Sequence, residues 1–206
     1  MSTVERSAHH PVRCQAIVLA AGRGLRFDPS GQQFKLNQKL KDGATVIHRA
    51  VETVAQVFSE FHIIARAASN FEAQFLQRYG AHLRLCPDAE KGMGHSLAFG
   101  VSQLAPECEA CLVVLADMPW LQVTTLQHLR DQFLRDLDVG TATIIAPTYQ
   151  GQRGHPVGFA RVHFADLMSL QGDQGARALL KSNQVHEVAV DDVGVVRDLD
   201  TLADLG

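Results

Sequence analysis

The sequence lacks the features that mark membrane, secreted and nucleic-acid-binding proteins. No apolar run approaches the roughly 18 residues that a membrane helix needs. The net charge is -3 with histidine neutral, so no sequence-wide basic bias favours nucleic acid. Residues 1–13 are polar and contain no apolar core of a secretory signal. We therefore expect a cytoplasmic protein with a flexible N-terminal tail over residues 1–13 and no nucleic-acid or membrane partner.

Cysteine and histidine are also too sparse, or wrongly spaced, for common metal and disulfide frameworks. The four cysteines are too few to staple a chain of 206 residues. Cys108 and Cys111 form a lone Cys-x-x-Cys, whereas a zinc knuckle needs a second pair. Cys111 also begins an apolar run, which favours a buried strand cysteine. No two of the ten histidines have the His-x-x-x-His spacing, so we expect no zinc site.

Short apolar runs alternate with longer segments of helical periodicity, which is typical of α/β proteins. The expected strands are 15–19, 62–65, 83–86, 112–116, 142–146, 157–159 and 186–190. The expected helices are 46–58, 71–78, 96–104, 124–136, 165–170, 175–181 and 201–205. Continuous apolar strands indicate burial on both faces and mostly parallel pairing. The pattern predicts one α/β domain over residues 14–206, with a three-layer, doubly wound, mostly parallel sheet.

Polar residues follow several of these strands at the end where such sheets bind ligands. Residues 22–26 follow the first strand, Asp117 follows the strand at 112–116, and residues 151–155 follow the strand at 142–146. We expect these groups to meet at one edge of the sheet. The late strand around residues 156–161 and the polar loop near Gly151 are expected to form a flap over the site.

The loop after the first strand has the chemistry of a phosphate-binding loop. It contains Gly22, Arg23, Gly24 and Arg26, and Lys35 lies nine residues further on. Glycine permits close backbone approach, successive N–H groups can bind an anion, and arginine and lysine supply positive charge. A dinucleotide fingerprint would have glycine where Phe27 stands, so NAD is disfavoured. The alternative is a tight turn with solvated basic residues.

The segment Leu19-Ala20-Ala21-Gly22-Arg23-Gly24-Leu25-Arg26 resembles the nucleotide-binding loop of the NTP-transferase superfamily. It is most similar to the MobA-like branch, whose members attach a nucleotide to molybdopterin. The resemblance implies a Rossmann-like nucleotidyltransferase fold. It also implies that the backbone of residues 19–24 wraps a triphosphate, which Arg26 and Lys35 contact as catalytic residues. The Ala20-Ala21 pair resembles the cytidylyl (MocA-like) group, and Leu25 stands where many members have a hydroxyl side chain.

Asp117 is the best candidate for a metal-binding carboxylate. A carboxylate at the end of a buried strand, followed by proline, suits Mg²⁺ with its preference for oxygen ligands, although capping or turn aspartates are also common. Asp117-Met118-Pro119 resembles the Asp-Met-Pro motif of the family, whose aspartate binds the metal. Residues 197–205 have the pattern of a helix start and also resemble the family's C-terminal segment. There an aspartate completes the metal site, and Asp200 is preferred to Asp198.

Two further segments resemble substrate-binding loops of the family. Gly94, His95 and Ser96 precede a helical run and correspond to the loop that reads the base and ribose, although a simple loop is the alternative. Gly154-His155-Pro156 and the segment from Gly172 to Arg177 resemble segments of the cytidylyl branch. The acceptor-binding candidates in and beside them are Arg153, His155, Asp173 and Arg177.

The resemblance implies a Mg²⁺-dependent nucleotidyltransferase that uses small-molecule substrates. We expect it to transfer CMP from CTP to a phosphorylated acceptor, best matched by molybdopterin, and to release pyrophosphate. One alternative is a transferase that uses GTP or a sugar or polyol phosphate. Another is a non-catalytic maturation factor that delivers the cofactor to a molybdoenzyme partner.

Overall fold

A computed structural model describes residues 13–22, 24, 27–28, 33–66 and 78–205 of the chain. Residues 1–12, Arg23, Arg26 and most of the helix expected over 71–78 lie outside these ranges. Arg13, which we placed in the tail, belongs to the folded domain. Its guanidinium pairs with Glu109 and with Asp138, each at 2.7 Å.

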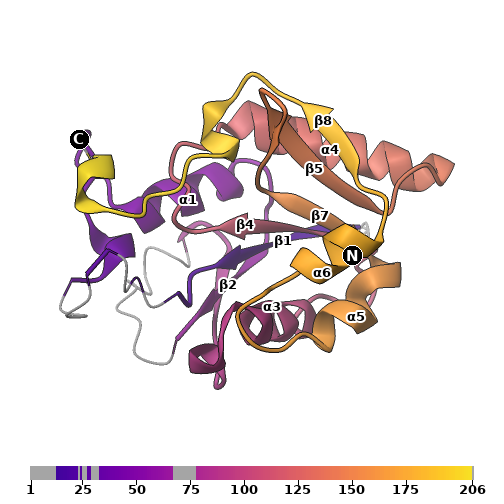
Figure 1. The fold of residues 1–206 in the computed structure, drawn as a ribbon, viewed down its shortest axis with the longest axis horizontal. Coiled ribbons are helices and arrows are strands. Elements are labelled where there is room, and N and C mark those ends of the chain that lie inside the picture. The colour runs from indigo at the N-terminus through magenta and orange to yellow at the C-terminus, as the bar shows by residue number, and fades with distance from the viewer. Residues whose placement is uncertain (1–12, 23, 25–26, 29–32, 67–77, 206) are drawn as a thin grey trace, which may run out of the picture.

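An eight-stranded sheet forms the centre of the molecule, with the order β3-β2-β1-β4-β7-β5-β6 and β8 paired with β5 (Figure 1). Its strands are β1 (Cys14–Leu19), β2 (Phe61–Ala65), β3 (Ala81–Leu85), β4 (Ala110–Leu115), β5 (Ile144–Tyr149), β6 (Gln152–Arg153), β7 (Val157–Ala160) and β8 (His186–Ala189). Strands β1 to β4 pair in parallel. The largely buried, mostly apolar sequences of β1, β2 and β4 predict this pairing, whereas β3 is a partly exposed edge strand. Strand β8 is parallel to β5.

Strand β7 corrects one of our expectations. We expected this segment to lie in a flap, but β7 is antiparallel to both β4 and β5 and lies between them. All four of its residues are buried. A Cβ atom on Gly158 would lie 2.8 Å from the ring of Phe133, so helix α4 packs directly on this strand. Only a side chain as small as glycine permits that close approach.

Helices cover both faces of the sheet (Figure 1). They are α1 (Val46–Ala55), α3 (Met93–Ser102), α4 (Val123–Val139), α5 (Phe164–Met168) and α6 (Arg177–Ser182). On β1, Ala16 and Val18 pack in one apolar cluster with α1 and α4, while Ile17 packs in a second cluster with α3 and α5. This division follows from the alternation of side chains along a strand. The predicted three-layer α/β fold with a mostly parallel sheet is confirmed.

Short 3-10 turns complete the chain: η1 (Lys35–Asn37), η2 (Ala89–Lys91), η3 (Arg161–His163), η4 (Val193–Val195) and η5 (Leu202–Leu205). The last of these replaces the α-helix expected over residues 201–205. Among the described helices, none has the length and apolar character needed to cross a membrane.

Candidate active site

The site lies at the carboxyl ends of β1 and β4, where the strand order of the sheet reverses. β4 ends at Leu115, and Asp117 follows two residues later. The backbone on both sides is fixed, because the N–H of Ala20 donates to Ile64 O at 2.8 Å and that of Ala116 donates to Leu19 O at 3.0 Å. The loop after β1 and the carboxylate after β4 are therefore held at the same edge, as the sequence predicts.

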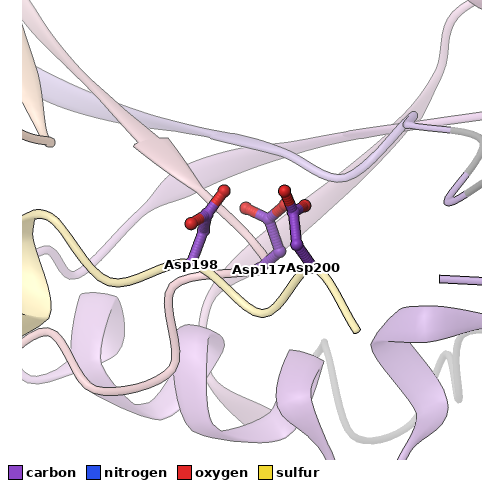
Figure 2. A group of neighbouring side chains, drawn as sticks. All are labelled: Asp117, Asp198 and Asp200. Carbon is purple, nitrogen blue, oxygen red and sulfur yellow. The ribbon is translucent and has the colours of Figure 1, made fainter. Parts of the chain in front are cut away.

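Three carboxylates gather at this edge. One oxygen of each of Asp117, Asp198 and Asp200 lies within 4.8 Å of the other two. Figure 2 shows the three carboxyl groups on one side, with Asp117 from the loop after β4 and the others from the C-terminal segment. Mg²⁺ and Mn²⁺ prefer oxygen ligands, so this donor set fits a hard divalent cation. Asp198 and Asp200 both belong to the group, whereas the sequence ranked one above the other.

Lys35 lies against the same carboxylates. Its Nζ is 2.8 Å from Asp117 Oδ2 and 3.3 Å from Asp200 Oδ1. The Lys35 side chain is only 11% exposed. The sequence placed Lys35 beside a triphosphate and did not predict its ion pairs with the aspartates.

The described part of the glycine loop packs beside Lys35. Gly24 has φ +64, a conformation that L side chains rarely adopt. Its carbonyl accepts the N–H groups of Phe27 at 2.9 Å and Asp28 at 3.0 Å, which closes a tight turn. A Cβ atom at Gly24 would approach Lys35 Cβ to 3.3 Å. Of the other residues predicted to bind nucleotide here, Ala20 and Ala21 are buried, Leu19 is half-buried and Gly22 is exposed.

Backbone hydrogen bonds hold the C-terminal aspartates in place. The N–H of Leu199 donates to Asp117 O at 2.8 Å, so the residue between the two aspartates is tied to the third. Asp204 accepts the N–H of Thr201 at 2.7 Å, its hydroxyl at 2.9 Å and the N–H of Asp200 at 3.0 Å. These bonds, led by that of the Thr201 N–H, lower the pKa of Asp204. Asp204 is a positioning residue that the sequence reading missed.

The preceding residues are fastened to the loop after Asp117. Asp192 accepts N–H bonds from Gly194 at 2.8 Å and from Gln122 at 3.0 Å. The Arg197 guanidinium lies 3.8 Å from the centre of the Trp120 ring, a cation–π contact. The sequence could indicate the bond to Gly194, because an aspartate two residues before a glycine often accepts its N–H. It could not indicate the bond to Gln122, which is 70 residues away in sequence.

His155, which the sequence predicts to bind the acceptor, lies close enough to the carboxylates for the charges of Asp117 and Asp198 to act on it. The backbone N–H of His155 donates to the backbone carbonyl oxygen of Val195 at 2.7 Å. Its Nδ1 is buried and finds no hydrogen-bond partner among the described residues. Burial lowers the pKa of His155, the charges of Asp117 and Asp198 act to raise it, and Arg177 acts to lower it. His155, Arg177 and two of the aspartates are thus electrostatically coupled.

The first turn of α3, which contains Gly94, His95 and Ser96, corrects a second expectation. Glycines there were expected to leave N–H groups free for a ligand, but the N–H of Gly94 donates to Gly172 O at 2.7 Å. The N–H of Gly172 in turn donates to His95 Nδ1 at 3.2 Å. Ser96 is 4% exposed, and its side chain interacts with the Cys86 thiol. The segments assigned to the base and to the acceptor therefore form one structural unit.

The remaining acceptor candidates lie at the surface. Arg153 donates from Nε to Glu187 Oε1 at 3.0 Å, and its side chain is 38% exposed. Asp173 and Arg177 are both exposed. Asp173 packs against Gly92, the residue that precedes α3. Arg153 is thus occupied by an exposed ion pair, whereas Arg177 acts on His155.

The four cysteines do not take part in this chemistry. All four are buried free thiols. Burial raises the pKa of each of them, so none is an activated thiolate. This agrees with the interpretation of Cys111 as a strand residue and leaves the site without a cysteine nucleophile.

The MobA-like NTP transferase domain matches residues 16–188 of the chain. The chain belongs to this family. The family is one of nucleotidyltransferase domains, as its name states. Asp198 and Asp200 lie after the matched region.

Two relatives are similar to much of the chain. The chain is 34% identical to the purine catabolism protein PucB of Bacillus subtilis over 131 residues, which cover 62% of this chain and 60% of PucB. It thus spans less than two thirds of that relative. Rv0371c of Mycobacterium tuberculosis has 28% identity and a TM-score of 0.73, covering 95% of this chain and 96% of its own.

Two further solved structures inform the site and the fold. A structure of Rv0371c in complex with manganese, at 27% identity, has a TM-score of 0.68 and covers 93% of this chain and 95% of its own. A nucleotidyl transferase of Methanothermobacter, at 18% identity, has a TM-score of 0.74 and covers 93% of this chain and 94% of its own. The latter shows likeness of fold alone.

Proposed function

We propose that this MobA-like protein transfers CMP from CTP to the terminal phosphate of molybdopterin and releases pyrophosphate. The observation that carries the transferase chemistry is the group of three carboxylates beside Lys35, at the end of the glycine loop. The choice of CTP and molybdopterin is supported by the Ala20-Ala21 pair and by the two segments that resemble the cytidylyl branch. The manganese complex of Rv0371c supports a divalent-cation requirement.

In the proposed reaction an oxygen of the acceptor phosphate forms a bond to the α-phosphorus of CTP. The bond from that phosphorus to the oxygen bridging to the β-phosphate breaks, and pyrophosphate leaves with the electron pair. Such transfers depend on positioning and charge stabilisation more than on covalent chemistry by the protein. No side-chain nucleophile is needed, in keeping with the four buried cysteines.

We assign the proposed roles from the carboxylate group, from Lys35 and from the family resemblance. Asp117, Asp198 and Asp200 would hold Mg²⁺ or Mn²⁺, which when bound neutralises charge on phosphate oxygens. Lys35 and Arg26 stabilise negative charge on the leaving pyrophosphate, and the backbone of residues 19–24 orients the triphosphate. The family resemblance assigns the base and ribose to Gly94, His95 and Ser96, whose polar groups are engaged within the fold, so any contact with the nucleotide uses the surface of this segment rather than those groups.

We propose that the acceptor binds on the side of His155. The imidazole of His155, on which the charges of Asp117 and Asp198 act, orients an acceptor phosphate oxygen. Arg177 supplies positive charge there, and Asp173 and Arg153 lie at the rim of the acceptor region. Arginine suits this role because its fork matches phosphate oxygens.

Pyrophosphate release from each of CTP, GTP, ATP and UTP, with Mg²⁺ and molybdopterin, tests the proposal. We expect turnover with CTP alone and at least a 100-fold loss in Asp117→Asn, about the effect of removing one electrostatic contact to a transition state. Asp191→Asn is the matched control, because Asp191 is an exposed aspartate of the same C-terminal segment outside the carboxylate group.

The alternatives predict different results in the same assay. Preference for GTP would overturn the base assignment, and turnover with sugar or polyol phosphates but not molybdopterin would overturn the acceptor. A non-catalytic maturation factor would bind CTP tightly without releasing pyrophosphate with any acceptor. Full activity of Asp117→Asn would remove the carboxylate group from the mechanism.

A further inference from the structure

Lys35 occupies the position where a cation would neutralise the carboxylates. Its ammonium bridges Asp117 Oδ2 at 2.8 Å and Asp200 Oδ1 at 3.3 Å, and these residues share one cluster with Asp198. At 11% exposure the Lys35 side chain is enclosed rather than solvated. The lysine thus supplies the positive charge that holds the carboxylates together.

A divalent ion and this ammonium compete for the same oxygens. Three carboxylates carry three negative charges, of which Lys35 neutralises one, so the group still attracts a divalent ion. Mg²⁺ requires its oxygen ligands at 2.0–2.1 Å in near-ideal geometry. An ammonium bridging two of those oxygens would lie a few ångströms from the ion and would repel it. Entry of the ion therefore favours departure of Lys35.

The fold offers Lys35 a second place to bind. Gly24 lies beside it, with only 3.3 Å between Lys35 Cβ and a Cβ atom built on that glycine. The loop containing Gly24 is the one proposed to bind the triphosphate. Phosphate oxygens held there would accept the three N–H donors of the ammonium, and the four-carbon stem of lysine allows the movement.

We propose that Lys35 is a tethered cation that fills the metal position in the nucleotide-free protein and moves to the phosphates when metal and nucleotide bind together. The proposal rests on the proposed function for the metal and triphosphate sites. It makes metal and nucleotide binding mutually dependent, because each removes an obstacle for the other. By thermodynamic linkage, nucleotide tightens metal binding by the same factor as metal tightens nucleotide binding.

Titration of the full chain with Mn²⁺, followed by electron paramagnetic resonance of the free ion, tests the exchange. For Lys35→Met we expect Mn²⁺ alone to bind about tenfold more tightly than to the wild type, within the usual range of coupling between sites. A non-hydrolysable CTP analogue should tighten Mn²⁺ binding to the wild type by about tenfold and to Lys35→Met by much less. Lys35→Arg keeps the charge and should behave like the wild type.

Lys39→Met is the matched control, because Lys39 is exposed and has no carboxylate within ion-pair distance among the described residues. Its Mn²⁺ affinity should equal that of the wild type. Circular dichroism establishes that each variant is folded, and Lys35→Gln replaces Lys35→Met if the latter is not. A crystal structure with Mn²⁺ and the analogue should show Lys35 Nζ on a phosphate oxygen and out of contact with Asp200.

The possible failures are distinguishable. Unchanged Mn²⁺ affinity in Lys35→Met, or a metal complex in which Nζ still bridges both carboxylates, overturns the exchange while leaving the metal site intact. If no variant binds Mn²⁺, with or without nucleotide, the metal part of the proposed function fails and the exchange fails with it. Whenever the wild type binds Mn²⁺, Asp117→Asn should abolish that binding.

Discussion

Replacing Asp198 with asparagine should stabilise the protein against unfolding when divalent ions are absent, although it removes a proposed metal ligand. Asp198 is exposed and lies within 4.8 Å of the carboxylate oxygens of Asp117 and Asp200. The ion pairs of Lys35 within the group go to the other two aspartates. The charge of Asp198 therefore repels those of Asp117 and Asp200, and Lys35 makes no ion pair with Asp198 that would offset this repulsion.

The size of the effect follows from the separation. Two unit charges 4.8 Å apart repel by about 0.9 kcal/mol in a medium as polar as water. Asp198 faces two such charges, and the nearby Lys35, which makes no ion pair with it, offsets about one of them, so the net gain in the free energy of unfolding is about 1 kcal/mol. For a domain of this size that corresponds to a rise in Tm of roughly 2–4 °C. Salt should reduce it, because these charges are partly exposed.

Thermal and urea unfolding in EDTA, repeated with excess Mn²⁺, measures both halves of the prediction. In EDTA, Asp198→Asn should unfold at a higher temperature than the wild type, while Asp191→Asn should match the wild type. With Mn²⁺ the wild type and Asp191→Asn should gain stability by ligand binding to the folded state, and Asp198→Asn should gain less. Lower stability of Asp198→Asn in EDTA, or an equal gain from Mn²⁺, would refute the reasoning.

Three other predictions concern different parts of the molecule. Burial, then the charges of Arg84 and His82, lower the pKa of His62 to about 4. As the pH decreases from 6.5 to 4, the unfolded chain therefore binds more protons than the folded protein, and the free energy of unfolding decreases. Between pH 7 and 4.5, urea unfolding of His62→Leu should show a loss of stability about 2 kcal/mol smaller than that of the wild type. In Gly154→Ala the new Cβ would lie 2.6 Å from the Val195 carbonyl carbon, so Tm should fall by the equivalent of about 1–3 kcal/mol. Initial-rate measurements should show that Arg177→Ala lowers kcat/KM for the acceptor about tenfold. Arg153→Ala should leave kcat/KM unchanged, because it removes only an exposed ion pair with Glu187 that contributes little free energy.

The middle of the sheet could be predicted because β1 and β4 are largely apolar and buried. The run from residue 15 to 19 and the run from 112 to 116 became neighbouring parallel strands within a residue or two of the expected bounds. Strand β7 could not be placed, because four apolar residues suit an inner strand and a flap equally well. Its position depends on Gly158, whose missing side chain admits Phe133 from α4. That contact joins residues far apart in sequence and leaves no periodic pattern.

The site was partly predictable for a similar reason. Its aspartates and Lys35 stand out, since charged residues at the ends of buried strands and in short loops are chemically distinctive. The ion pairs that Lys35 makes with Asp117 and Asp200 were not predictable. Gly94 shows the limit most clearly: glycine before a helix indicates free N–H groups, but a carbonyl from Gly172 accepts this one. The sequence gives no sign that these two loops meet.

The two aspartates that complete the carboxylate group lie beyond the family-matched region, which ends at residue 188, so local contacts of this chain must position them. Those contacts run mainly through the backbone: Leu199 N–H to Asp117 O at 2.8 Å, and His155 N–H to Val195 O at 2.7 Å. The same bonds join the predicted acceptor residue His155 and the β4 aspartate to one segment. A displacement of residues 193–200 would therefore disturb the metal and acceptor sides of the site together.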